Sequence, residues 1–393
     1  MIYLDYNATT PVDPRVLAEM LPMFGIEFAN PSSKHPAGQR AAERVEKARG
    51  QVAELLGTQR KNLIFTSGAT ESAALGIRGA VALVAAARPG RHRVLVGATE
   101  HKAVLEAAGP DAQTIRVLPD GTLDLEHLRW MLDTDVALVA VMAANNETGV
   151  LHDVAAAARL AHQAGALFFC DTTQAAGRVP VTLDEWGIDL AVASAHKIYG
   201  PKGVGVLAAT RAVRAKLPPL FGGGGQERGL RGGTSNAAGI VGYGAAAALA
   251  AKELPDWAHR QSDLVRLLRD ELAVRVDTGG EPISVHGQGA PRLPNTLCVR
   301  IPGVEADAVL SCLPDVMISA GAACSSAIPE PSHVLLAMGV TPTAAEESLR
   351  FSVGRPTTEA EIRTAAGLVA QAVARVRELN NPTRKADYDR ATA

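Results

Sequence analysis

Seven short apolar segments, separated by segments with helical spacing, constrain the fold of this 393-residue chain more than any other feature. Apolar strands that alternate with helices are typical of a mostly parallel sheet covered on both faces. The expected strands are Asn62–Thr66, Arg93–Gly97, Thr114–Leu118, Val136–Met142, Ala166–Cys170, Asp189–Ser194 and Gly203–Ala208. The expected helices include Thr70–Ala87, Leu123–Leu132 and Val154–Ala164. Because such sheets bind ligands beyond the carboxyl ends of their strands, the residues that follow each strand are the functional candidates.

The pattern changes after the seventh strand. Two helical stretches, Asn236–Leu254 and Asp263–Arg275, come first. The remainder contains expected strands and helices at Ile283–His286, Thr296–Ile301, Ala306–Leu313, Val316–Ser319, Leu349–Val353 and Thr358–Glu378. This order predicts a smaller α+β domain. We therefore expect a large domain at residues 15–254 and a small domain made of residues 1–14 and 255–393.

Composition excludes several classes of protein. Lys and Arg number 39 and Asp and Glu 41, so the net charge of −2 argues against a nucleic-acid binder that relies on a positive field. The four cysteines form no C-x-x-C pair, which argues against a zinc site and fits a reducing cytosol. No signal peptide is expected, and the longest uncharged apolar run, 237–251, is too short to span a membrane. We expect a cytoplasmic protein with no membrane partner.

Lys197 and Asp171 are the first candidates for chemistry. Lys197 lies in SAHKIYGPKGVG (194–205), after an apolar strand, where partial desolvation would lower its pKa and permit a Schiff base. Asp171 follows the apolar segment ALFFC and could hold a protonated pyridine nitrogen. Such a pair is the pattern that pyridoxal phosphate requires, and Gln174 could reach the phenolic oxygen of the same ring. Taken alone, Lys197 is as compatible with a surface charge and Asp171 with a helix cap.

A phosphate site and a ring contact are suggested by two further segments. TSGATES (66–72) runs from a strand through Gly68 into a helix, which offers backbone N–H groups, a helix dipole and the Thr70 hydroxyl. His101 follows another strand and could stack on a ring or move protons. Asn146 follows the strand at 136–142, and the glycine-rich stretch 221–236 could approach an anion or another subunit closely. An N-cap, a surface histidine and a flexible loop are the alternatives.

Cys324 is the cysteine most suited to act as a nucleophile. It lies in SAGAACSS (319–326), among residues too small to pack a core tightly. Cys170, Cys298 and Cys312 occupy apolar strand or helix patterns, so we expect them to be structural. An accessible thiol on a loop is the one able to react.

Taken together, these segments resemble the cysteine desulfurases, pyridoxal-phosphate enzymes with the aspartate-aminotransferase-type α/β fold. The matching segments are YLDYNATTPVDPR (3–15), NPSS (30–33), TSGATES, TEHKAV (99–104), NNETGV (145–150), Asp171 through Gln174, SAHKIYGPKG, Gly233-Thr234, Cys324 and LRFSVGR (349–355). The resemblance implies a large domain with a mostly parallel seven-stranded sheet and a smaller α+β domain. It also implies a homodimer that uses pyridoxal 5'-phosphate.

The resemblance implies a role for each matching residue. Lys197 would hold the cofactor covalently and move protons, and Cys324 would accept sulfur from L-cysteine as a persulfide. His101 would stack on the ring, while Arg350 and Asn30 would bind the substrate. The remaining cofactor contacts would be Ala69, Thr70, Asn146, Asp171, Gln174, Ser194 and His196, with Thr234 reaching the phosphate of the partner subunit.

Other functions remain open from the sequence. A selenocysteine lyase shares the whole constellation, and an aminotransferase shares the fold but has no use for a loop cysteine. A non-catalytic scaffold for sulfur-transfer partners would not need Lys197, Asp171, His101 and Cys324 together. The sulfur acceptor could be an iron-sulfur scaffold or a protein of another sulfur pathway.

Overall fold

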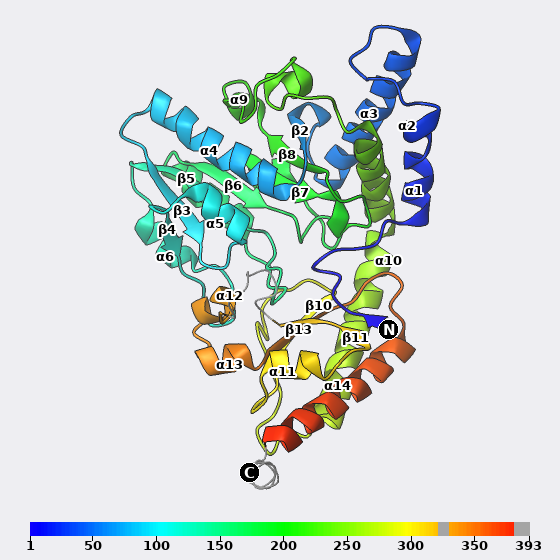
Figure 1. Ribbon diagram of the computed structural model, residues 1–393. Coiled ribbons are helices and arrows are strands. Elements are labelled where there is room, and N and C mark those ends of the chain that lie inside the picture. Colours follow the sequence, from blue (N-terminus) through cyan, green and yellow to red (C-terminus); the bar gives the residue numbers. More distant parts are fainter. Residues whose placement is uncertain (321–329, 381–393) are drawn as a thin grey trace, which may run out of the picture.

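A seven-stranded sheet with helices on both faces forms the large domain of the protein (Figure 1). The computed structural model describes residues 1–320 and 330–380. The strands are β2 (Leu63–Thr66), β3 (Arg93–Gly97), β4 (Gln113–Ile115), β5 (Val136–Ala140), β6 (Leu167–Asp171), β7 (Leu190–Ser194) and β8 (Gly205–Ala209). Their order is β2-β8-β7-β6-β5-β3-β4, and β8 alone runs antiparallel to its neighbours. The predicted mostly parallel sheet is confirmed.

Buried apolar side chains explain why these segments form central strands. Every residue of β2, β5, β7 and β8 is buried, as expected for strands covered on both faces. The helices of this domain are α1 (Pro14–Met20), α2 (Pro22–Gly25), α3 (Pro36–Leu55), α4 (Ala69–Ala87), α5 (Lys102–Ala108), α6 (Leu125–Met131), α7 (Val154–Gln163), α8 (Leu183–Trp186) and α9 (Arg211–Arg214). We did not predict α1, α2, α3, α5, α8 and α9 from the sequence.

Within the described part of the chain, α4 is long and apolar enough to cross a membrane by length and composition alone. Leu75, Ile77 and Ala80 of this helix are buried in one cluster with Ile64 and Leu207 of the sheet. Its apolar character is therefore used to cover the sheet.

The small domain contains a four-stranded antiparallel sheet and a two-stranded parallel one. Its strands are β1 (Ile2–Tyr3), β9 (Ser284–Val285), β10 (Thr296–Arg300), β11 (Val316–Met317), β12 (Ser319–Ala320) and β13 (Ser348–Ser352), and its helices are α11 (Ala306–Ser311), α12 (His333–Ala337), α13 (Pro342–Glu346) and α14 (Glu359–Asn380). We predicted one strand at 316–319. The chain instead divides there, because β11 pairs with β1 whereas β12 pairs with β13.

One continuous helix, α10 (Ala237–Arg275), joins the two domains, so the prediction of two separate helices is wrong. Pro255 lies inside it, where the missing N–H normally interrupts a helix. The helix continues because each half has its own core to pack against. Ala246, Ala247 and Ala250 are buried with the large-domain sheet, while Leu264, Leu268 and Leu272 are buried with the small domain. The two cores thus meet α10 on opposite sides of Pro255.

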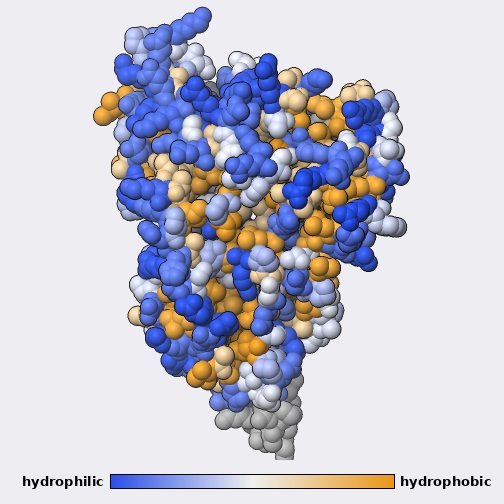
Figure 2. Space-filling view, turned by 180° about the vertical axis from the view of Figure 1, so that it is seen from behind, coloured by the Kyte–Doolittle hydropathy of each residue, from blue (hydrophilic) through white to orange (hydrophobic). Residues whose placement is uncertain are grey.

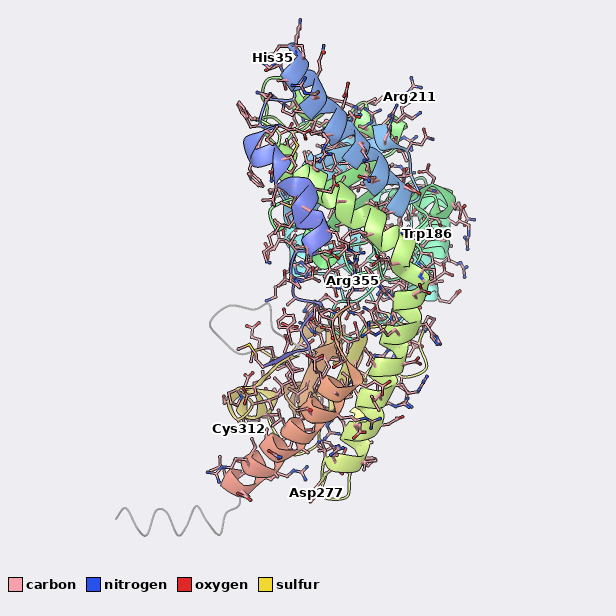
Figure 3. All side chains as sticks on the ribbon, turned by 90° about the vertical axis from the view of Figure 1, so that its right-hand side faces the viewer. His35, Trp186, Arg211, Asp277, Cys312 and Arg355 are labelled. Atoms are coloured by element: carbon pink, nitrogen blue, oxygen red, sulfur yellow. The ribbon has the colours of Figure 1, made fainter. Side chains whose placement is uncertain are left out.

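The N-terminal segment and Arg355 also link the domains. Ile2 and Leu4 belong to the core of the small domain, whereas Val16 and Met20 belong to that of the large domain. The guanidinium of Arg355 lies 3.1 Å from the ring centroid of Trp257 on α10, and its Nη1 donates to Asp13 at 3.0 Å. Figure 3 shows Arg355 at the level where the domains meet, with α10 extending along both. Seen from behind, the surface is largely hydrophilic, with hydrophobic patches on both domains (Figure 2).

Candidate active site

A cavity of about 490 Å³ opens where the carboxyl ends of the parallel strands face the small domain. Such a volume is typical of a site for a small organic ligand. Ten of the residues predicted to bind cofactor or substrate line it: Ala69, Thr70, His101, Asn146, Asp171, Gln174, Ser194, His196, Lys197 and Arg350. Nine of them follow or end strands of the large sheet, whereas Arg350 comes from β13 of the small domain.

Lys197 directs its amine into the cavity from the short helix that follows β7. This 3₁₀ helix, η2, covers Ala195–Lys197 and begins where β7 ends. Lys197 Nζ donates to the carbonyl oxygens of Asn7 at 2.6 Å and Ala8 at 2.8 Å. The N-terminal segment therefore holds the amine at the cavity wall, a contact between residues some 190 positions apart in the sequence.

Asp171 ends β6, and the residue is only 8% exposed. Its Oδ1 accepts a hydrogen bond from the Thr173 backbone N–H at 2.8 Å. Gln174 lies one turn further on. Its Nε2 donates to the Asn7 carbonyl at 3.1 Å, and the Arg178 guanidinium donates to its Oε1, so the amide orientation is set. A buried carboxylate and an oriented amide face the same space as the Lys197 amine.

The start of α4, which also lines the cavity, offers groups that suit an anion. Helix α4 starts at Ala69, and the first N–H groups of a helix lack partners within it. A Cβ added to Gly205 would lie 2.6 Å from the Gly68 backbone, so only glycine allows this close approach of β8 to the turn before α4. Burial, assisted by the charge of Lys197, lowers the pKa of His196 to about 4, which leaves its ring neutral at pH 7. His196 Nδ1 lies 3.1 Å from Thr9 Oγ1.

His101 lies at the start of α5, where its Nδ1 accepts a hydrogen bond from the Ala103 backbone N–H at 3.1 Å. Burial lowers the pKa of His101, although the nearby charge of Asp171 opposes that shift. In the neutral ring Nε2 therefore carries the hydrogen. An uncharged imidazole of defined tautomer is thus available beside the cavity.

Arg350 brings a buried positive charge to the cavity from the small domain. Its Nη2 donates to Asp5 Oδ1 at 2.6 Å and to Ser319 Oγ at 3.0 Å, and its Nη1 donates to the Asn146 carbonyl at 3.2 Å. Its Nε is buried without a hydrogen-bond partner among the described residues. An unpaired N–H on a buried guanidinium is costly, which fits a group that binds an anionic ligand.

Three predicted residues are not among those that line this cavity. Asn30 is exposed, and its Oδ1 accepts from the Ser32 backbone N–H in a local turn. Its contact with the substrate stays a prediction. Thr234 lines a neighbouring pocket of about 240 Å³ that shares Ser67 and Gly203 with the cavity. Cys324 lies outside the described residues.

The structure adds lining residues that we did not predict from the sequence. Asn7, Ala8 and Thr9 come from the N-terminus, and their segment carried no strand-end signal. Lys202 and Gly203 precede β8 rather than follow a strand. The rule that functional residues follow strands did not identify Lys202 and Gly203. Because β8 runs antiparallel to β2 and β7, its amino end lies at the edge where those two strands end.

Glu147, next to Asn146, contains a buried carboxyl that makes stability depend on pH. Ser332, which caps α12, donates its hydroxyl to Glu147 Oε2. Burial raises the pKa of Glu147 to about 7 from 4.5, although Ser332, Arg350 and Lys102 act in the opposite direction. The native state therefore keeps this proton up to about pH 7, whereas the unfolded chain loses it near pH 4.5. The free energy of unfolding should fall as pH rises through that interval, by about 3 kcal/mol in total.

The Glu147→Gln variant should lose this pH dependence, since an amide accepts the Ser332 hydrogen bond without charge. At pH 4 it should nearly match the parent, and at pH 8 its free energy of unfolding should be about 3 kcal/mol higher. Urea unfolding at both pH values measures the difference. Glu126→Gln is the control, because Glu126 is 80% exposed and pairs only with Arg129 on the surface. Equal shifts for Glu147→Gln at both pH values would contradict the assignment.

The residues present fit pyridoxal phosphate. A buried acid, an amine and an oriented amide face one part of the cavity, while helix N–H groups and the Gly205 close approach face another. The hydroxyl oxygen of Thr173, which lines the same cavity, is buried with no hydrogen-bond partner among the described residues. A ligand that carries both a ring and an anion would meet these groups.

The sequence model of the family described as Aminotransferase class-V matches residues 2–364. A cysteine desulfurase of Frankia sp. (strain EuIK1) is 54% identical, over 98% of this chain and 94% of its own length. Cysteine desulfurase IscS of Anaeromyxobacter sp. (strain Fw109-5) is 45% identical over 96% of this chain and 94% of its own length. A solved NifS-like protein superposes with a TM-score of 0.86 at 34% identity, covering 95% of this chain and 99% of that structure.

Proposed function

Since the chain belongs to the aminotransferase class-V family, we infer that it is a pyridoxal-phosphate-dependent cysteine desulfurase. It converts L-cysteine to L-alanine and passes the sulfur to Cys324 as a persulfide. The observation that carries this proposal is the convergence of Lys197, Asp171 and Arg350 on one cavity from three separate parts of the chain. Similar cysteine desulfurases match nearly the whole sequence.

The bound cofactor supplies a carbonyl carbon for an amine and a ring that takes up electrons released at the substrate Cα. The Asp171 carboxyl group would hold the ring nitrogen by a hydrogen bond. Lys197 would take the proton from Cα and return one to the product, because its amine is held at the cavity wall by the carbonyls of Asn7 and Ala8. Gln174 would donate its second amide hydrogen to the ring oxygen.

Arg350 orients the substrate. The residue is 2% exposed, and its guanidinium is fixed by Asp5, Ser319 and the Asn146 carbonyl, with Nε left for the substrate carboxylate. Charge-assisted hydrogen bonds in a dry site are strong and directional. The neutral His101 ring, whose hydrogen is on Nε2, would cover the cofactor and would donate a proton as the substrate sulfur changes charge.

In the sulfur-transfer step, a bond between two sulfur atoms forms and a carbon–sulfur bond breaks. The Cys324 thiolate attacks the substrate sulfur, the bond between Cβ and that sulfur breaks, and Cβ receives a proton to give alanine. The two electrons of the broken bond remain on the carbon, so one sulfur is transferred for each alanine and no external oxidant is needed. A thiolate is required because a thiol is a poor nucleophile.

Product analysis of the holoenzyme tests this function against the selenocysteine-lyase alternative. With L-cysteine and a thiol reductant, we expect alanine and sulfide in equal amounts, and without reductant about one persulfide per active site. The same measurement is made with L-selenocysteine. Turnover of selenocysteine with no turnover of cysteine would favour the lyase, and turnover of neither would contradict the enzymatic function.

We also propose that the enzyme is a homodimer. Leu17, Phe24, Ile26 and Phe28 are 45–89% exposed and lie close together in the sequence around α1 and α2. Exposed apolar side chains in such a group are typical of an interface. Thr234 supports the same proposal, since its role in the family is to reach the partner's phosphate.

The proposed location is the cytoplasm, and the proposed acceptor is a sulfur-carrying protein such as an iron-sulfur scaffold. Cys170, Cys298 and Cys312 are free thiols among the described residues, as expected in a reducing compartment. The scaffold is inferred from the similarity to cysteine desulfurases.

A further inference from the structure

Lys202 reaches the active-site cavity because β8 runs antiparallel to its neighbours β2 and β7. Gly205, the first residue of β8, pairs with Thr66 at the end of β2 and with Ser194 at the end of β7. The chain just before β8 therefore lies at the edge where those strands end, beside the turn that leads into α4. Lys202 and Gly203 line the cavity there, together with Ser67 and Gly68.

The two other cationic side chains that line the cavity already have hydrogen-bond partners within the chain. Lys197 donates to the carbonyls of Asn7 and Ala8, and Arg350 is paired with Asp5. Lys202 is the third cationic side chain among the described residues that line the cavity. His196 is neutral at pH 7, since burial lowers its pKa to about 4, and the charges of Lys197 and Lys202 contribute to that shift.

One acidic residue also lies beside the phosphate-binding turn. Glu71, in the first turn of α4, accepts from the Ser67 backbone N–H at 2.8 Å. Its charge is offset by Arg231, whose Nε lies 3.1 Å from Glu71 Oε1. The pair itself carries no net charge, whereas a phosphate monoester carries about −1.5 to −2 at pH 7.

We propose that Lys202 compensates the charge of the cofactor phosphate, so that it acts as a cofactor-binding residue for the 5'-phosphate. This inference rests on the proposed function, because it assumes that the ligand is pyridoxal phosphate. The Lys202 side chain is exposed at the cavity mouth, so solvent screens its charge. The contribution should therefore be moderate and should decrease with salt. It should also be absent for a ligand without a phosphate.

Equilibrium binding to the apoenzyme tests the proposal, with pyridoxal phosphate and pyridoxal as the two probes. Lys202→Gln should weaken the binding of pyridoxal phosphate by about 10-fold at low ionic strength, which corresponds to about 1.4 kcal/mol. The loss should shrink to about 3-fold or less at 0.5 M salt, where the Debye length is only a few ångströms. The affinity for pyridoxal should not change, and Lys202→Arg should restore most of the affinity for the phosphate ester.

Lys252→Gln is the matched control, since Lys252 is exposed on α10 and is not among the residues that line the cavity. Unchanged pyridoxal phosphate affinity in Lys202→Gln, or an equal loss for pyridoxal, would overturn the proposal. Either outcome leaves the proposed function standing. If the parent apoenzyme itself did not bind pyridoxal phosphate, the proposed function would fail instead.

Discussion

Lys197→Ala is expected to abolish both the covalent attachment of pyridoxal phosphate and the formation of alanine from cysteine. The amine of Lys197 is held by a backbone carbonyl at the wall of the cavity that Asp171 also lines, and proton transfer by a positioned group is worth about 10²–10⁴ in rate. We expect the turnover number to fall by at least about 10³-fold. The yellow colour and near-visible absorbance of the purified protein should be lost, as measured by spectroscopy and steady-state assay.

As a control, the Lys197→Ala variant should be shown to keep the parent fold. Lys197 Nζ bonds to two carbonyls of the N-terminal segment, so its removal should cost some stability but should leave the buried strands of the sheet unaffected. Circular dichroism and urea unfolding measure this. Lys197→Arg keeps the charge but cannot form the covalent link, so it should be inactive too. Full activity in either variant would end the pyridoxal-phosphate assignment.

The same variant shows whether Thr234 acts in the partner subunit. Mixed with Thr234→Ala subunits, Lys197→Ala subunits should form heterodimers with one doubly altered site and one intact site, so activity should partly return. The alternative is that Thr234 acts in its own chain, because it lies in a pocket that shares Ser67 and Gly203 with the cavity of that chain. No recovery, with subunit exchange verified, would assign Thr234 to that cavity.

Cys324→Ser is expected to bind cysteine and shift the cofactor spectrum, yet to release almost no sulfide or alanine. A serine hydroxyl is a poor nucleophile towards sulfur and cannot hold a persulfide. We expect a loss of at least about 100-fold, equivalent to about 2.7 kcal/mol in the barrier. Mass spectrometry of the parent enzyme, after one turnover without reductant, should find one added sulfur on the peptide that contains Cys324.

Cys312→Ser is the matched control. Cys312 is half-buried at the end of α11 and lies in the lower part of the small domain (Figure 3). Cys170 and Cys298 are less suitable, because both are fully buried, and burial raises the pKa of the Cys298 thiol to about 12. Cys312→Ser should keep near-parent turnover. Sulfur on a peptide other than that of Cys324, or parent-level desulfuration by Cys324→Ser, would contradict the role of Cys324.

The sheet and most of its functional edge were predictable because their signals are local. Each strand is a short apolar run bounded by polar or turn residues, so its position depends on few neighbours in sequence. The strand-end rule then identified Asp171, Lys197 and His101 as residues that would meet, and all three line one cavity. Family resemblance added Arg350, whose side chain points to the same place from β13.

Long-range pairing decided what the sequence could not. Local pattern does not encode which strands become neighbours or in which direction they run. The antiparallel placement of β8 brings Lys202 to the phosphate end, and the docking of the N-terminus brings the carbonyls of Asn7 and Ala8 to Lys197. The same reason explains α10, where Pro255 indicates a break that burial against two separate cores overrides. The sequence by itself therefore determined the strands of the large sheet and most of the reactive groups, whereas tertiary packing determined which of those groups share a cavity.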